Sequence, residues 1–128
     1  LGEEILRMGA DFFVPVPVHP RRKRVRGFNQ AELIAKRLGE RLEIPVRTDV
    51  LKRIKNTLPQ KGLGSAARLN NLLKAFAVKN ADKLAGKTVI LVDDIYTTGS
   101  TAEACTLVLL SGGTKNVYLL NMAAGRAR

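Results

Sequence analysis

The sequence is poor in the residues that build disulfides, metal clusters and aromatic surfaces. Its 128 residues include one cysteine, one histidine and no tryptophan, and aromatic residues make up 5%. A lone Cys105 excludes an internal disulfide and a cysteine zinc cluster, and a lone His19 excludes a histidine metal cluster. No hydrophobic run is long enough to span a bilayer, and no signal-peptide pattern is present. We therefore expect a cytoplasmic protein without a membrane partner.

Positive charge is what the sequence has in excess. Lys and Arg number 22 against 11 for Asp and Glu, which gives a formal net charge of +11 at pH 7. Such an excess favours polyanionic partners such as phosphates, pyrophosphate or nucleic acid. A solvated basic surface would explain scattered lysines, but not clusters of cations at the mouths of strands.

The length and composition fit one globular domain, expected over residues 1–128. The first residues resemble the end of a helix, so we expect the chain to be a piece of something longer, and we leave a homodimer open. Alternating strands and helices predict a parallel sheet with helices on both faces, with ligands at the carboxyl ends of the strands. The predicted helices are 1–9, 29 to about 41 (capped by Asn29 with Glu32), a short one capped by Ser65, and 102–110. The predicted strands are 12–16, 44–46, 50–54, 75–78, 88–92 and 117–123, followed by a frayed tail at 125–128.

The clearest functional signal lies between Thr88 and Thr101. An apolar β-branched run predicts a strand buried on both faces, and it ends at the adjacent carboxylates Asp93 and Asp94. A turn of small and hydroxylated residues follows, and a helix begins after it. Small side chains let a ligand approach the backbone, and a helix N-terminus favours an anion. The residues predicted to bind a phosphate are Thr97, Thr98, Gly99, Ser100 and Thr101.

The two carboxylates would repel that phosphate, so they need a different partner. Carboxylate oxygens accept hydrogen bonds, which the vicinal hydroxyls of a ribose can donate. The implied ligand therefore has its ribose near Asp93 and Asp94 and a 5′-phosphate in the turn. Either half of the pattern alone would fit an acid-capped strand or a simple Ser/Thr helix cap.

A second cationic loop follows the first predicted strand. It has five cations within six positions, and because like charges repel at that density, we expect an anion near them. The order of strand, cationic loop and helix repeats that of the phosphate turn. Contact with nucleic acid or a membrane surface would also suit these cations. The residues are Arg21, Arg22, Lys23, Arg24 and Arg26.

The stretch 88–101 resembles the ribose-phosphate signature of type I phosphoribosyltransferases, which is an apolar strand, two acidic residues and Thr-Thr-Gly-x-Thr. Two further patterns resemble the ComF/GntX branch of that superfamily. One is Val14-Pro15-Val16-Pro17 followed by 19–21 and 26–30, and the other is the string Arg53, Thr57, Gln60, Leu63, Arg68, Asn71 and Phe76. The resemblance covers about residues 12–123. It implies a three-layer α/β fold with a mostly parallel twisted sheet and a flexible β-hood over about 50–78, and it leaves an N-terminal truncation open.

The resemblance also implies a ligand and an activity. The ligand is phosphoribosyl pyrophosphate, with Mg²⁺ coordinated by its diphosphate and sugar hydroxyls and not by a protein site. The phosphoribosyl group would pass to an acceptor that the sequence does not identify, with release of pyrophosphate. Asp93 and Asp94 would hold the sugar hydroxyls, and either could assist proton transfer. Residues 97–101 would anchor the 5′-phosphate, the cationic loop would bind the pyrophosphate, and Arg68 is a further expected substrate-binding residue.

Two other functions fit the same residues. One is a binding module for DNA uptake that holds single-stranded DNA and keeps a non-catalytic ligand pocket, since ComF relatives are associated with natural competence. The low aromatic content argues against it, because single-strand binders stack bases on aromatic rings. The other is a regulator that senses phosphoribosyl pyrophosphate. Full-length members of the branch often carry an N-terminal four-cysteine zinc module, which this sequence lacks.

Overall fold

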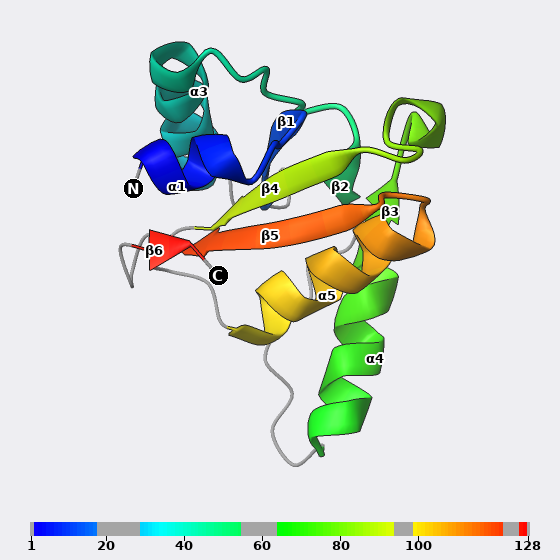
Figure 1. Cartoon of the computed structure of the whole chain (residues 1–128). Helices are drawn as coiled ribbons and strands as arrows, with labels where there is room; N and C mark the ends of the chain where they lie inside the picture. The colour runs from blue at the N-terminus through cyan, green and yellow to red at the C-terminus, as the bar shows by residue number, and fades with distance from the viewer. Residues whose placement is uncertain (1, 18–28, 55–63, 94–98, 122–125, 128) are drawn as a thin grey trace.

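The computed structural model describes residues 2–17, 29–54, 64–93, 99–121 and 126–127 (Figure 1). Helices and strands alternate along most of the chain, as the hydrophobic pattern predicts. The elements are α1 (Gly2–Arg7), β1 (Phe12–Pro15), α3 (Gln30–Leu42), β2 (Leu51–Arg53), α4 (Ser65–Ala75), β3 (Phe76–Val78), the 3-10 turn η1 (Ala81–Lys83), β4 (Thr88–Asp93), α5 (Gly99–Ser111), β5 (Asn116–Asn121) and β6 (Arg126–Ala127).

The main sheet has the strand order β1-β4-β5-β6, in which β1, β4 and β5 are parallel and β6 is antiparallel to β5. Strand β4 is central, and every residue from Val89 to Asp93 is buried. A strand covered on both faces needs an apolar run without alternation, which is what this segment has. The structure confirms the predicted α/β fold with a mostly parallel sheet.

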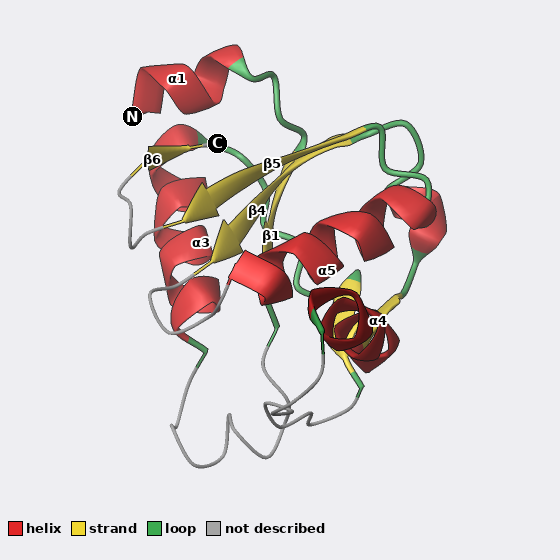
Figure 2. Ribbon diagram, turned by 90° about the horizontal axis from the view of Figure 1, so that it is seen from below, coloured by secondary structure: helices red, strands yellow, loops and turns green. Residues whose placement is uncertain are grey.

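The two faces of β4 belong to different hydrophobic clusters because successive side chains of a strand point in opposite directions. Val89 and Leu91 pack in the cluster that includes residues of α5, α4 and the β2–β3 pair. Ile90 and Val92 pack with residues of α1 and α3. Figure 2 shows α4 and α5 on one side of the sheet and α1 and α3 on the other. We call these the α5 side and the α3 side.

A separate two-stranded antiparallel sheet, β2–β3, lies on the α5 side, with α4 between its strands in the sequence. Leu51 pairs with Val78, and Arg53 pairs with Phe76. Val78 lies beside the end of α5, since a Cβ added at Gly112 would be 3.1 Å from Val78 Cγ1. The predicted hood residues 51–53 and 76–78 therefore form a hairpin-like pair that packs on the core.

One side chain, Asn29, connects the end of β1 with the start of α3. Its Oδ1 accepts a hydrogen bond from the backbone N–H of Glu32, as predicted for a helix cap. Its Nδ2 donates to the backbone oxygen of Val16, 13 positions earlier. A single buried amide thus positions both the strand and the helix.

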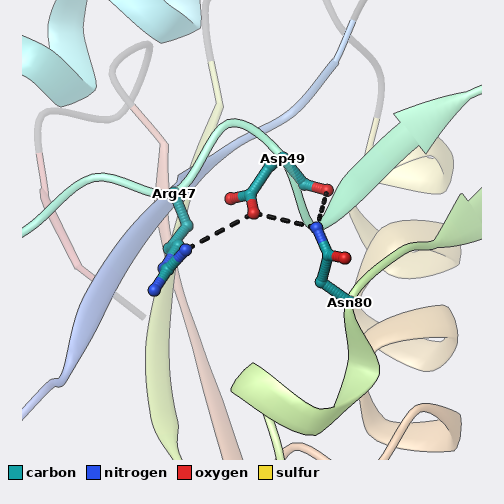
Figure 3. A network of polar contacts seen from close by, with 3 residues as sticks. All are labelled: Arg47, Asp49 and Asn80. Atoms are coloured by element: carbon teal, nitrogen blue, oxygen red, sulfur yellow. Dashed lines mark hydrogen bonds and ion pairs between the residues drawn. The ribbon is translucent and has the colours of Figure 1, made fainter.

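A polar network joins the segment before β2 to the turn after β3 (Figure 3). Asn80 Nδ2 lies 2.9 Å from Asp49 Oδ2, and Arg47 Nη1 lies 3.4 Å from the same oxygen. Partial burial alone would raise the pKa of Asp49, but hydrogen bonds from its own backbone and from Asn80 outweigh it. The charges of Arg47 and Lys83 act in the same direction, so the pKa lies below its ordinary value of 3.8.

Three local predictions were wrong. Residues 44–46 form only a single bridge, from Val46 to Phe13, because Pro45 has no N–H to extend the ladder. Helix α4 is capped by the backbone of Gly64, not by Ser65, since residue 65 is already helical and the cap makes no side-chain hydrogen bond. The expected frayed tail includes β6, because the edge of β5 offers a partner at Leu120 and Asn121.

Among the described residues, no helix is long and apolar enough to cross a membrane.

Candidate functional site

Asp93 is the last residue of β4 and is fully buried at the carboxyl edge of the main sheet. Asp93 lies two positions after Leu91 and four after Val89 in the strand, so its side chain is on the same face as theirs, the α5 side. Asn121 is its register partner at the end of β5, on the same face of the sheet. A carboxyl and a carboxamide therefore lie next to each other where ligands of parallel sheets bind. The sequence analysis named Asp93 but missed Asn121, whose signal is a polar residue ending an apolar strand.

Helix α5 begins at Gly99, which is earlier than the predicted residue 102. Its first turn therefore contains Gly99, Ser100 and Thr101, three of the residues predicted to bind a phosphate. The first N–H groups of a helix have no intrahelical acceptor, and they carry the positive end of the helix dipole. Thr101 is buried at 8% exposure. The structure thus confirms the predicted order of buried strand, carboxylate and helix start.

Cys105 lies on the second turn of α5, inside the α5-side cluster. Burial raises the pKa of its thiol well above the ordinary value of 9.0, the Asp93 carboxylate adds to the rise, and the positive charge of Arg53 opposes it. The side chain acts as a small apolar residue, as predicted. Asp93 and Arg53 are thus the charged groups that act on this buried thiol.

Arg53 approaches this region from the β2–β3 pair. Its guanidinium carbon lies 5.3 Å from the centre of the Phe76 ring, which is a cation–π distance. Phe76 is 4% exposed and belongs to the α5-side cluster together with Cys105. The string of residues in the ComF resemblance contains both Arg53 and Phe76, but neither was among the predicted site residues.

The other predicted site residues are distributed as follows. Arg68 lies on α4, which packs against α5, and its side chain is not described. Within the described residues, no group of three or more His, Cys, Asp or Glu could hold a metal ion. Eight predicted site residues lie outside the described residues: Asp94, Thr97, Thr98, Arg21, Arg22, Lys23, Arg24 and Arg26.

Comparison with solved structures identifies the class of fold. The chain is similar to the crystal structure of a purine phosphoribosyltransferase from Pyrococcus horikoshii, with a TM-score of 0.55 at 20% identity, over 92% of this chain and 64% of that one. At this identity the similarity shows the fold alone. The molecule has a type I phosphoribosyltransferase-like α/β fold.

Comparison of sequences identifies the family. Residues 25–127 match the phosphoribosyl transferase domain. The chain is 35% identical over 111 residues to competence protein F of Haemophilus influenzae. It is 34% identical over 109 residues to DNA utilization protein YhgH of Escherichia coli. The chain therefore belongs to the phosphoribosyltransferase domain family, and within it to the ComF type. It covers 48% and 47% of those two relatives, so it spans about half their length.

Proposed function

We propose that this chain binds phosphoribosyl pyrophosphate with Mg²⁺ and transfers its phosphoribosyl group to an acceptor, with release of pyrophosphate. The observation that carries the proposal is the buried carboxylate of Asp93 at the carboxyl end of the central strand, six positions before the first residue of α5. The carboxylate suits ribose hydroxyls, and the helix start suits the 5′-phosphate. The family match over residues 25–127 supports the same reading.

In the proposed reaction, the bond between the anomeric carbon of the ribose and the pyrophosphate oxygen breaks, and the electron pair leaves with pyrophosphate. The acceptor then forms the new bond to the anomeric carbon. Asp93 holds the ring hydroxyls in place, and the start of α5 fixes the 5′-phosphate, so that the reacting carbon stays aligned. Mg²⁺, when bound through the diphosphate oxygens that it prefers as ligands, would stabilise the negative charge of the leaving pyrophosphate.

A thermal unfolding experiment tests ligand binding. Phosphoribosyl pyrophosphate with Mg²⁺ should raise the melting temperature, and Asp93→Asn combined with Asp94→Asn should abolish the rise. Asp11→Asn is a matched control, because Asp11 lies at the opposite end of β4, where its Oδ2 accepts a hydrogen bond from the N–H of Thr88 at 2.9 Å. This control should keep the rise. Pyrophosphate release across a panel of purine, pyrimidine and amine acceptors then tests transfer. A wild-type protein whose melting temperature does not change would contradict the proposal.

A second candidate function is a competence or DNA-uptake factor that binds single-stranded DNA. The names of the relatives, competence protein F and DNA utilization protein YhgH, favour it, as does the net charge of +11. Salt-sensitive binding of single-stranded DNA that survives the double Asp substitution would support this function over the first. DNA binding that is lost with the two carboxylates would instead tie it to the ligand site.

A further inference from the structure

We propose that the amino edge of the main sheet, on its α5 side, is a binding surface for single-stranded DNA, separate from the ligand site at the carboxyl edge. This inference rests on the second candidate function, because it assigns DNA binding to one place on the molecule. The surface has one stacked arginine and four exposed lysines. We call it the amino-edge surface, and its residues are Arg47, Lys79, Lys83, Lys87 and Lys115.

Two of the lysines stand at the starts of neighbouring parallel strands. Lys87 precedes Thr88, the first residue of β4, and Lys115 precedes Asn116, the first residue of β5. Thr88 and Asn116 are register partners, and the backbone N–H of Lys115 donates to the carbonyl of Lys87 at 2.8 Å. Figure 1 shows these starts on the side of β2 and β3, and the strand ends on the side of β6. The two exposed side chains therefore leave the backbone at adjacent points of one edge.

The turn before β4 adds two more lysines at this edge. Lys83 lies on η1, and the next residue, Leu84, is fully buried in the α5-side cluster, so the turn is held against the core. The N–H of Lys87 donates to the carbonyl of Leu84 at 3.0 Å. The N–H of Lys83 donates to the carbonyl of Asn80 at 2.9 Å, and Lys79 immediately precedes that residue. The lysines thus project from backbone that hydrogen bonds hold in place.

Positive charge exceeds negative charge on this surface. Within the described part of the chain, none of the four ammonium groups forms an ion pair. Two nearby carboxylates are already occupied, since Asp11 accepts from the N–H of Thr88 and Asp49 accepts from Asn80. Asp82 is the one acid on η1. A chain of phosphates can therefore contact these lysines and release their counterions, which is what drives the binding of nucleic acids to basic surfaces.

A stacked pair at the same edge suits a nucleobase. Phe12 is the first residue of β1, and its ring centre lies 5.4 Å from the guanidinium carbon of Arg47. Phe12 pairs in register with Val89, the second residue of β4, so the stack is at the amino edge. The Arg47 side chain keeps 30% of its surface exposed, and its Nη1 lies 3.4 Å from Asp49 Oδ2 (Figure 3). Unpaired bases stack on guanidinium planes and aromatic rings, which favours a single strand over a polyanion without bases.

The amino-edge surface and the ligand site lie at opposite ends of β4. The strand runs from Thr88 to Asp93, which is about 16 Å at the rise of a parallel strand. This separation exceeds the screening length of about 8–10 Å at physiological salt. A strand of DNA at one edge and a phosphorylated ligand at the other should therefore bind at the same time, without displacing each other.

Fluorescence anisotropy with a labelled oligothymidine strand tests the inference on the full chain. The amino-edge variant combines Lys83→Gln, Lys87→Gln and Lys115→Gln. The matched control neutralises three exposed lysines of α3, β2 and α4, and combines Lys36→Gln, Lys52→Gln and Lys74→Gln. At about 0.1 M salt the amino-edge variant should bind about tenfold or more weakly than wild type, and its slope of log K against log[salt] should be shallower by about 2. The control should stay within about threefold of wild type.

A strand of the same length without bases separates stacking from charge. Because it carries the same phosphates but nothing to stack, the wild type should bind it about fivefold or more weakly than oligothymidine. Arg47→Lys keeps the positive charge but removes the plane, so it should abolish this difference. Equal affinity of the wild type for the two strands would overturn single-stranded DNA as the occupant of this surface.

The remaining outcomes decide between this inference and the function on which it rests. If the triple amino-edge variant does not fold, Lys87→Gln with Lys115→Gln decides the question in the same way, with a slope shallower by about 1.4. Equal losses in the amino-edge variant and the control would overturn this inference alone, as would displacement of the strand by phosphoribosyl pyrophosphate with Mg²⁺. A wild-type chain that does not bind the strand would overturn the second candidate function and this inference with it.

Discussion

Gly39 of α3 lies directly against Val46, the residue that bridges to β1. A Cβ atom at position 39 would be 2.7 Å from Val46 Cγ2 and 2.7 Å from the backbone oxygen of Ile44. The N–H of Ile44 also donates to the carbonyl of Gly39, so the chain turns back tightly at the end of the helix. Gly39 is therefore the point at which α3 contacts the segment that returns from it.

This contact predicts that Gly39→Ala destabilises the protein. Alanine normally stabilises a helix interior relative to glycine by about 0.5–1 kcal/mol. Here the added methyl group would displace backbone, so we expect a net loss of about 1–3 kcal/mol in the free energy of unfolding. Urea denaturation measures it. Gly64→Ala is the control, because a Cβ at Gly64 meets nothing within 4 Å, and it should change stability by less than about 1 kcal/mol.

The buried hydroxyl of Thr114 predicts a stabilising substitution. Within the described residues, Thr114 Oγ1 is buried and makes no hydrogen bond. Thr114→Val keeps the shape and removes the desolvated oxygen, and it should leave stability unchanged or raise it by about 1 kcal/mol. Thr106→Val is the opposite case, since Thr106 Oγ1 donates to the carbonyl of Ala102 at 2.9 Å. Equal effects of the two substitutions in urea denaturation would contradict this prediction.

The pKa of Asp49 predicts an acid-dependent contribution to stability. Because its folded pKa lies below 3.8, the ionised group contributes stability above that pH, and the contribution is lost as the pH falls through the folded pKa. The carboxyl side chain is 42% exposed, so solvent screening keeps the effect below about 1 kcal/mol. Asp49→Asn should flatten the fall in unfolding free energy below about pH 4. An Asp49→Asn variant that keeps the wild-type fall in unfolding free energy would contradict this prediction.

Cys105 predicts a loss of stability at alkaline pH and a protected thiol. Its folded pKa is raised, so the protonated thiol contributes to stability below the unfolded pKa of about 9.0. This contribution is lost as the pH rises through and above that value. Cys105→Ala should remove this alkaline slope, although it lowers the overall stability by leaving a small cavity. A thiol reagent should label the wild-type protein only in denaturant. Rapid labelling of the native protein at pH 7 would contradict the buried position.

The parts of the fold that were predictable depend on local sequence. The run 89–92 is apolar at every position, so burial on both faces follows without knowing its neighbours. The cap at Asn29 follows from a side chain that reaches the N–H of Glu32, three residues away. The class of fold and the placement of Asp93 at a strand end follow from these local signals.

The parts that were missed depend on contacts distant in sequence. Strand β6 forms only because β5 offers its edge, and two residues carry no strand signal of their own. The contact of Leu51 and Phe76 with the core depends on how the β2–β3 pair packs on α5, which no spacing within 51–53 encodes.

The double role of Asn29 has a consequence for how this family can diversify. Its amide group hydrogen-bonds to the backbone of Val16 and to the first turn of α3. Both ends of the stretch 17–28 are therefore held in place whatever the residues between them are. Substitutions, insertions or deletions within that stretch can therefore be accommodated while the framework keeps its shape. Relatives with the asparagine should therefore tolerate wide variation there, and those without it should vary less.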